Sequence, residues 1–488
     1  AVLSSMVIKK MKSTDVAQKF SDYFDFSEPL RSCNSHRLLA MRRGETLGIL
    51  RVSISIDEKD CIERLNRQFV HGKGACQTLV AEAIEDSFKR LINPSIENEF
   101  ARLSKEKADE DAIKVFTENL RQLLLSAPLG QKRVLALDPG YSNGCKIACL
   151  DAQGSLLHHE IIYPHPPKRL YAQATVAMMR MINQYHIEAI AIGNGTASRE
   201  SKEFVTDCIT HLSEEGKETP KVFVVSEDGA SIYSASAIAR EEFPNEDVTT
   251  RGAVSIGRRL IDPLAELVKI DPKSIGVGQY QHDVDQAELR RSLDLTVESC
   301  VNQVGVNLNT ASKHLLMYVS GLGSVLAQNI VDYRKEHGAF TSRTQLKKVP
   351  RLGTVAYQQS AGFLRIPNAK NPLDNSAVHP ESYHIVEAMA KNKNCTVKEL
   401  INNKKLLEHI NLEEFVSTEV GLLTLNDILH ELEKPGRDPR EQLKEFEFDK
   451  SVHTIADLKE GMELPGIVTN ITNFGVFVDV GVHQDGLV

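Results

Sequence analysis

The chain has 488 residues, about three times the length of a typical domain, so several domains are expected rather than one core. Hydrophobic residues make up 41% and charged residues 25% of the chain, which excludes a fibrous or wholly disordered architecture. The net charge of -8, taken alone, argues against a nucleic-acid-binding protein.

The sequence lacks the signals of a secreted or membrane protein. No run of about 18 apolar residues is present, and the first residues do not have the pattern of a signal peptide. The eight cysteines are scattered and form no CxxC pair, which indicates reduced, packed thiols rather than a zinc site. We therefore expect an intracellular protein with no membrane contact, no bound metal and no cofactor.

Five consecutive segments differ in their hydrophobic pattern and together predict a multidomain protein of class α plus α/β. Residues 1–129 are mostly helical, with one strand-like alternation in ETLGILRVSISID. Residues 130–262 alternate β-rich runs such as VLALD with helical stretches, which is typical of an α/β domain. Helical patterns return in residues 263–370 and, with many acidic residues, in residues 371–460. Residues 461–488 begin short alternating strands.

The basic charge is concentrated in one part of the chain. Residues 313–370 contain nine Lys or Arg against two Asp or Glu, whereas residues 371–488 contain 11 against 21. The overall charge therefore hides a basic island, and the argument against nucleic acid does not hold for this island.

Two glycine-containing turns between helical stretches lie in the basic island, SGLGS at 320–324 and PRLGT at 350–354. Glycine permits a tight turn, and the first amides of the following helix point outward, where a phosphate can accept them. Such contacts carry no sequence information, so we expect sequence-tolerant, salt-dependent binding of RNA or DNA. Two ordinary turns in a helical bundle are the alternative. The candidate contacts are Gly321, Leu322, Gly323, Ser324, Lys347, Lys348, Arg351, Leu352, Gly353 and Thr354.

Three carboxylates of the α/β segment are candidates for a metal-dependent site. Asp138 and Glu227 follow the strands VLAL and VFVV, at strand ends where open α/β sheets bind ligands, and Asp262 lies within RRLIDPLAEL. If the three converge, they can bind Mg²⁺ and support attack of water on a phosphodiester. Alternatively, Asp138 forms the turn before Pro-Gly, and the other two are surface or capping residues.

Several stretches resemble a known family. LDPG, AIAIGNGT and SEDGASIYSASAIA are similar to the YqgF domain, of RNase H type, of the Tex family of transcription accessory proteins. GVGQYQHD, NPLDNSAVHPESY and LTLNDILHELEKPGRDPRE resemble Tex segments in the same order, so the likeness to the family covers nearly the whole chain, and we expect the greatest similarity to its metazoan members. The resemblance implies a mixed sheet flanked by helices, followed by a tandem helix-hairpin-helix region. Tyr141 to Asn143 replace a basic residue and Asn194 replaces a carboxylate of the active nucleases, which implies a vestigial site.

The last segment, ELPGIVTNITNFGVFVDVGVHQDGLV, resembles the first part of an S1-type OB-fold. It is too short for a five-stranded barrel, so we expect a truncated one. Aromatic side chains of such barrels stack on bases, which makes Phe474, Phe477 and His483 candidates for a ligand face. Packing within the fragment is the alternative.

Together these patterns predict a non-catalytic, nucleic-acid-binding scaffold of the Tex family, linked to transcription or RNA metabolism. The resemblance implies transcription or chromatin proteins as further partners and an intracellular location, in the nucleus or, as the alternative, in the cytoplasm. Two alternatives stay open: a Mg²⁺-dependent, structure-selective nuclease that uses Asp138, Glu227 and Asp262, and a protein-interaction platform whose acidic helices bind partners. The separation of the three carboxylates distinguishes the nuclease from the other two.

Overall fold

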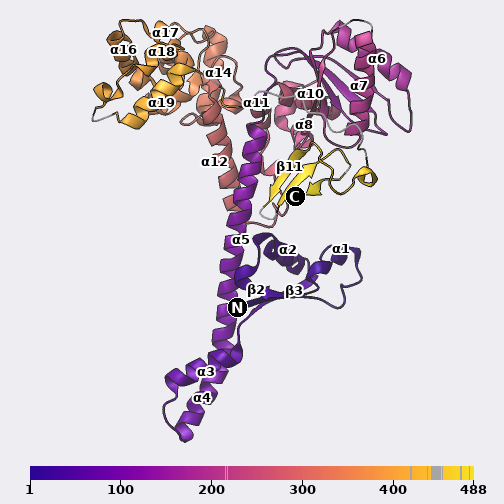
Figure 1. Cartoon of the computed structure of the whole chain (residues 1–488), viewed down its shortest axis with the longest axis vertical. Helices are drawn as coiled ribbons and strands as arrows, with labels where there is room; N and C mark the ends of the chain where they lie inside the picture. The colour runs from indigo at the N-terminus through magenta and orange to yellow at the C-terminus, as the bar shows by residue number, and fades with distance from the viewer. Residues whose placement is uncertain are drawn as a thin grey trace. The chain divides into compact units, whose positions relative to one another are not determined.

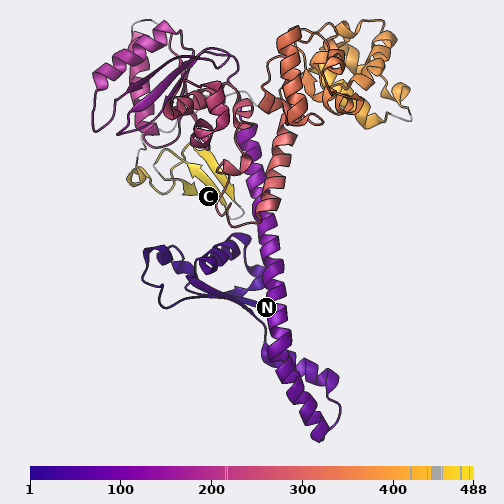
Figure 2. The ribbon, with the colours of Figure 1, turned by 180° about the vertical axis from the view of Figure 1, so that it is seen from behind.

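The computed structural model describes residues 1–488 except residues 215, 217, 418–419, 437, 441–451, 453, 473–474 and 483. The chain forms two compact units, one of residues 1–119, 277–293 and 448–488 and one of residues 120–276 and 294–447. Neither unit corresponds to one continuous stretch of sequence. Figures 1 and 2 show the elements from opposite sides.

The first unit opens with a three-stranded antiparallel sheet in the order β2-β1-β3, formed by β1 (Val2–Val7), β2 (Asp25–Pro29) and β3 (Leu50–Ser55). Helix α2 (Ser35–Thr46) contacts β3 and buries Leu39. A Cβ atom on Gly44 would lie 2.6 Å from Leu50 Cδ1, so glycine allows this close approach. The sequence predicted β3 but not β1 and β2, because serine and acidic residues in these two strands interrupt the apolar alternation that is typical of a strand.

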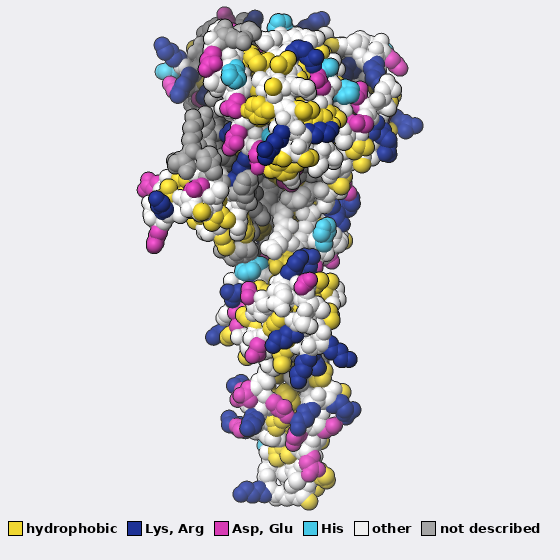
Figure 3. All heavy atoms as spheres, turned by 90° about the vertical axis from the view of Figure 1, so that its right-hand side faces the viewer, with side chains coloured by type: hydrophobic (Ala, Val, Ile, Leu, Met, Phe, Trp, Pro, Cys, Tyr) yellow, Lys and Arg dark blue, Asp and Glu magenta, His cyan; other side chains and the backbone are white. Residues whose placement is uncertain are grey.

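Four further helices complete the N-terminal part: α1 (Asp15–Gln18), α3 (Glu58–Phe69), α4 (Ala75–Ser87) and α5 (Asn93–Leu124). Exposed charges pair along them, as in Arg102 with Glu106 at 2.7 Å and Lys114 with Glu110 at 2.9 Å. Figure 3 shows Lys and Arg interspersed with Asp and Glu over these helices, in the lower part of the view. Such pairs contribute little stability, but they leave these helices without a basic patch.

The second unit contains a five-stranded mixed sheet in the order β6-β5-β4-β7-β8, formed by β4 (Val134–Asp138), β5 (Cys145–Leu150), β6 (Leu156–Ile162), β7 (Ala189–Gly193) and β8 (Lys221–Val225). Strands β4, β7 and β8 are parallel, so their carboxyl ends lie at one edge, while β5 and β6 run antiparallel to their neighbours.

Helices cover both faces of this sheet (Figure 1). Because side chains alternate along a strand, Leu135 and Leu137 join a core cluster with residues of α6 (Tyr171–Gln184) and α7 (Ser198–Glu214), whereas Ala136 packs with α10 (Val248–Ile261). The α/β fold predicted for this segment is confirmed.

The remaining elements between residues 230 and 433 are helices, apart from two strands of two residues each. The elements are α8 (Ala230–Ala235), α9 (Ala237–Glu242), α11 (Pro263–Leu267), α12 (Gln286–Val304), β9 (Val306–Asn307), α13 (Lys313–Leu316), α14 (Gly323–His337), α15 (Thr354–Ser360), β10 (Leu364–Arg365), α16 (Tyr383–Asn392), α17 (Val397–Leu400), α18 (Lys404–Glu408) and α19 (Leu422–Glu433). The acidic helices α16 to α19 share a hydrophobic cluster of their own.

The chain's last strands belong to the first unit: β11 (Ile467–Thr472), β12 (Gly475–Asp479) and β13 (Gly486–Leu487), hydrogen-bonded in this order. The two alternating strands predicted here are present, and Phe477 lies half-buried on β12. Phe474 and His483 lie outside the described residues. None of the helices in the described part of the chain combines the length and the apolar composition needed to cross a bilayer.

Candidate nucleic-acid interface

The first predicted turn joins α13 to α14. Gly321 and Gly323 have φ angles of +80° and +63°, in the left-handed region that favours glycine. Between them the side chain of Leu322 is buried, so it anchors the turn in the core and does not face a ligand, while Gly323 and Ser324 are exposed. The exposed start of α14 therefore presents backbone amides that have no partner within the helix.

The second turn follows a short 3₁₀ helix, η5 (Arg343–Lys348), and leads into α15. Leu352 is buried like Leu322, and Arg351, Gly353 and Thr354 are exposed, so the two turns share one pattern of burial. Arg351 occupies the place of Gly321 and has a φ of +65°. A left-handed conformation at a residue with a side chain costs about 1–2 kcal/mol, which makes Arg351 an unusual choice for a purely structural turn.

The two turns pack against each other. A Cβ atom on Gly321 would lie 2.6 Å from Gln359 Cβ and 3.4 Å from the carbonyl oxygen of Ala356, both on α15. Asn329 of α14 donates a hydrogen bond of 2.8 Å from Nδ2 to the carbonyl oxygen of Pro350 in the second turn. The hairpins thus form one body, a contact that the sequence pattern did not reveal.

Three cations surround the second turn and are exposed: Lys347, Lys348 and Arg351. Within the described part of the chain, none of them forms an ion pair with a carboxylate. Lys347 Nζ instead lies 4.6 Å from the centre of the Tyr357 ring, a cation–π contact that leaves its charge available to a ligand. The structure therefore brings the sequence-predicted cations to the same turn as the exposed backbone of Gly353.

Three arginines of the basic island are engaged inside the protein. Arg343 is 0% exposed and donates to the carbonyl oxygens of Leu364 and Val378 at 2.8 Å. Arg334 donates to two backbone carbonyls, and burial lowers the pKa of Arg365 to about 10. The count of nine cations thus overstates the charge available to a ligand, since a sequence does not show which side chains turn inward.

The carboxylate edge of the sheet brings together two of the three predicted carboxylates. Asp138 pairs in register with Lys146 of β5, and burial raises the pKa of Asp138 while Lys146 opposes the rise. Burial, and then the charge of Asp138, raise the pKa of Glu227. The backbone amide of Glu227 donates to Asn194 Oδ1 at 3.0 Å, so Asn194 fixes the ends of β7 and β8.

Asp262 does not join these two residues. It ends α10 and caps α11, accepting a hydrogen bond of 3.2 Å from the amide of Ala265, and it accepts further bonds from Arg440 at 2.7 and 3.4 Å. The convergence of three carboxylates considered from the sequence is therefore absent, because Asp262 serves as a helix cap and an ion-pair partner. In the described residues, no three His, Cys, Asp or Glu side chains gather closely enough to hold a metal ion.

The helix that covers the carboxylate edge supplies no replacement for Asp262. The Cβ position of Gly252 on α10 lies 4.0 Å from Asp138 Oδ2, and glycine places no side chain there. Arg259, also on α10, is almost fully buried and donates to the carbonyl oxygen of Ser226 at 2.8 Å. Two-metal phosphodiester hydrolysis needs a cluster of oxygen ligands, and the residues at this edge do not fit such a centre.

Five family models match the chain in sequence order. They are the Tex central region-like model (residues 1–116), the Tex protein YqgF-like domain (132–261), a helix-hairpin-helix motif (301–365), an HHH domain (371–440) and the S1 RNA binding domain (457–488). The helix-hairpin-helix match contains both turns described above.

Whole-chain relatives agree with these matches. The chain is 50% identical over 479 residues to the transcriptional accessory protein Tex of Neisseria gonorrhoeae, covering 96% of this chain and 62% of that protein. It is 46% identical to YdcI of Bacillus subtilis over 486 residues, covering 98% and 67%. It is 35% identical over 553 residues to human S1 RNA-binding domain-containing protein 1, covering 100% and 55%.

The chain thus spans about three fifths of the length of most of these relatives. The expected likeness to metazoan proteins is present, at lower identity than the likeness to the bacterial ones. Because bacteria have no nucleus, these comparisons give no support to the predicted nuclear location.

Proposed function

This chain belongs to the Tex family, and we propose that it binds RNA or DNA without sequence preference, through its two hairpins, in a role linked to transcription or RNA metabolism. The observation that carries the proposal is the repeated turn, in which a buried leucine is flanked by exposed backbone and, at the second turn, by three exposed cations with no carboxylate partner among the described residues. The name of the Neisseria relative and the matched S1 RNA binding domain support the same reading.

The chemistry of the hairpins favours the phosphate backbone as the ligand. Backbone amides at the start of α14 and the charges of Lys347, Lys348 and Arg351 all suit anionic oxygens. Binding is then dominated by counterion release and weakens steeply with salt. Phe477 of β12, with Phe474 and His483, stays a candidate for stacking on bases in the S1-type part.

The α/β domain acts as a scaffold in this proposal and not as a nuclease. Support comes from Lys146 beside Asp138 and from the engagement of Asp262 with Arg440. No cofactor and no Mg²⁺ take part. The five segments 1–129, 130–262, 263–370, 371–460 and 461–488 stay our proposal for the domain organisation.

Partners and location follow from the relatives. Transcription or chromatin proteins are the partners that a transcriptional accessory role implies, and the protein acts inside the cell where nucleic acid is found. The acidic helices α16 to α19 offer such partners a surface distinct from the hairpins.

A binding series with a hairpin variant tests the proposal. The variant carries Gly323→Pro, Lys347→Glu, Lys348→Glu and Arg351→Glu, and fluorescence anisotropy measures its affinity for single-stranded, double-stranded and structured DNA and RNA. We expect a loss of affinity of about 100-fold for every ligand, since phosphate contacts are lost irrespective of sequence.

A matched control separates the loss of hairpin contacts from the general effect of a more negative net charge on affinity. The variant Lys398→Glu, Lys404→Glu, Lys405→Glu reverses three exposed lysines of the acidic helices and should change affinity less than about threefold. Unaltered binding by the hairpin variant would refute the proposal. Cleavage of branched or single-stranded substrates with Mg²⁺ or Mn²⁺ that is lost in Asp138→Ala would refute the scaffold role of the α/β domain.

A further inference from the structure

Arg440 is held by two carboxylates from different parts of the second unit. Its guanidinium donates to both oxygens of Asp438 at 2.6 to 3.0 Å, and to Asp262 Oδ1 and Oδ2 at 2.7 and 3.4 Å. Asp438 is a neighbour in sequence, whereas Asp262 lies 178 residues away, between α10 and α11. A planar guanidinium can bridge two carboxylates in this way because its donors form a fixed fork.

Burial distinguishes this group from ordinary surface ion pairs. The Arg440 side chain is only 5% exposed, while Asp262 and Asp438 keep 37% and 40% of their side-chain surface. Burial alone would lower the pKa of Arg440, but the hydrogen bonds from its guanidinium to Asp438 and Asp262 raise it. The arginine charge is therefore compensated by two carboxylates at a position where the arginine itself is shielded from water, while both carboxylates stay partly exposed.

A second attachment lies just before Arg440. Glu431 Oε1, on α19, accepts hydrogen bonds from the amides of Ala377 at 2.6 Å and Gly436 at 2.8 Å. A Cβ atom on Gly436 would lie 2.5 Å from the carbonyl oxygen of Asn375, so this backbone is closely packed. The segment that leaves α19 is thus fixed to its own helical domain at Gly436 and to the α/β domain at Arg440.

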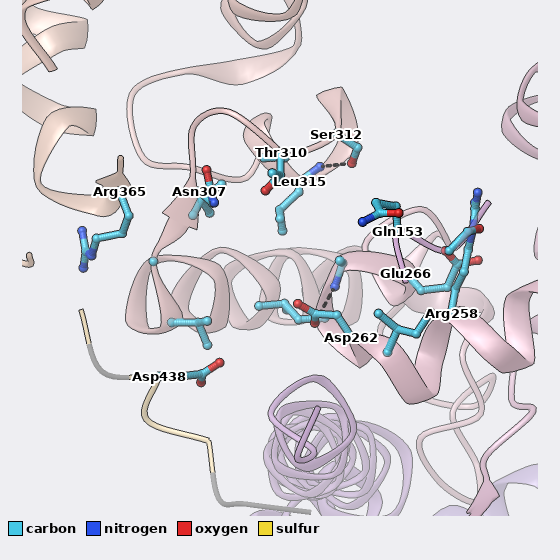
Figure 4. Close-up of a pocket in the computed structure, with 18 of the residues that line it drawn as sticks. Gln153, Arg258, Asp262, Glu266, Asn307, Thr310, Ser312, Leu315, Arg365 and Asp438 are labelled. Carbon is cyan, nitrogen blue, oxygen red and sulfur yellow. Dashed lines mark hydrogen bonds between the residues drawn. The ribbon is translucent and has the colours of Figure 1, made fainter. Parts of the chain in front are cut away.

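The bridging residues also complete a cavity of about 540 Å³ (Figure 4). The figure shows Asp262 at the end of its helix and Asp438 on a separate segment, with Asn307 and Thr310 on another wall. Four acidic and four basic side chains line the cavity, and several pair with each other, as Arg258 does with Glu242 at 2.7 Å. With its charges largely paired, the cavity offers no free charge set for a ligand, and its wall is held by the Asp262–Arg440 bridge.

We propose that Asp262, Asp438 and Arg440 form a clasp that fastens the chain leaving the acidic helices to the α/β domain. The clasp gives Asp262 a mechanical role in place of the catalytic one considered from the sequence. This inference does not depend on nucleic-acid binding by the hairpins.

Trypsin cleavage after Arg440 tests the clasp, because the protease must take the arginine side chain into its own pocket. In the parent chain we expect the bond from Arg440 to Glu441 to be cut at least about tenfold more slowly than the bond after the exposed Lys405. In Asp262→Asn the rate at Arg440 should rise about tenfold, corresponding to about 1.4 kcal/mol. Asparagine still caps α11, since it serves at this position as well as aspartate does, so only the charge is removed.

The control variant is Asp247→Asn, which alters the capping carboxylate at the other end of α10 and should leave cleavage at Arg440 unchanged. Mass spectrometry of hydrogen exchange gives a second reading. Deuterium uptake in peptides covering residues 438–440 should rise in Asp262→Asn, while uptake at 373–378 stays constant. Equal cleavage rates and equal uptake in the parent and Asp262→Asn would overturn the proposal, as would rapid cleavage at Arg440 in the parent.

Discussion

The hairpins and the carboxylate edge of the sheet both place charged residues next to exposed ends of secondary structure. The two places differ in whether these charges are exposed and whether they have a partner of opposite charge. At the second hairpin, Lys347, Lys348 and Arg351 are exposed and have no carboxylate partner in the described residues. At the sheet edge, Asp138 is largely buried beside Lys146, and burial raises its pKa. Charge that is exposed and unpaired is available to a ligand, whereas charge that is buried or compensated mainly determines stability.

Buried and exposed charges also occur side by side within the basic island, where Arg343 and Arg351 differ most in exposure. Arg343→Ala should destabilise the hairpin region by about 3 kcal/mol or more, because it leaves buried carbonyls and the Tyr383 hydroxyl without their donor. Arg351→Ala should change stability by less than about 0.5 kcal/mol. Hydrogen exchange of the amides in α14 and α15 measures both changes in stability. Similar effects of the two substitutions would show that the buried Arg343 and the exposed Arg351 do not differ in their contribution to stability.

Substitution of the glycines in the first turn gives the next largest expected loss of stability. Gly321→Ala should cost about 2 kcal/mol, because it combines a left-handed backbone with a clash against Gln359. Gly323→Ala has the same backbone strain but nothing within 4 Å of the new Cβ, and should cost about 1 kcal/mol. Urea denaturation of both variants checks the order; an equal cost would show that the two hairpins do not pack as described.

Arg351→Gly separates stability from binding at a single residue. Glycine relieves the left-handed strain, so the hairpin should become more stable by up to about 1 kcal/mol. Loss of the exposed charge should weaken nucleic-acid binding about three- to tenfold and lower the salt slope by about 1. A variant that gains stability and keeps full affinity would contradict the role of Arg351 in binding.

Glu227→Gln gives the smallest expected change in stability and tests the effect of a buried carboxylate at the sheet edge. The pKa of Glu227 is raised in the folded state, so the carboxylate lowers the stability of the fold once pH exceeds its value in the unfolded chain, about 4.3. The variant should therefore match the parent below this pH and become more stable as pH rises through the folded pKa. The gain at pH 7 should stay below about 1 kcal/mol, since water still screens the site. A gain that is largest at acidic pH would contradict the cause assigned to the shift.

The sequence predicted the parts of this molecule that depend on local patterns. VLALD is a buried strand because parallel strands covered on both faces require nearly continuous apolar runs, whereas KVFVV lies at the edge of the sheet and buries only Phe223. The burial of Leu322 follows from its place between two turn glycines. Because β4, β7 and β8 are parallel, the strand pattern also predicts that Asp138 and Glu227 lie at the same edge of the sheet.

The features that escaped prediction are long-range ones. The contact of Gly321 with Gln359, the inward turn of Arg343 and the bridge from Asp262 to Arg440 each join residues whose neighbours in sequence carry no sign of the partner. The sequence does not predict the weak strands β1 and β2 for a related reason, since the pairing of β1 with both β2 and β3 compensates for a poor local pattern.

The dependence of nucleic-acid affinity on salt tests the central claim most directly. Anisotropy titrations between 50 and about 300 mM salt give the slope of log K against log salt for the parent and for Lys347→Glu, Lys348→Glu, Arg351→Glu. We expect a steep slope in the parent that becomes shallower by about three in the variant, for DNA and RNA alike. Equal slopes in the two proteins would show that these cations do not contact phosphate and would contradict the account.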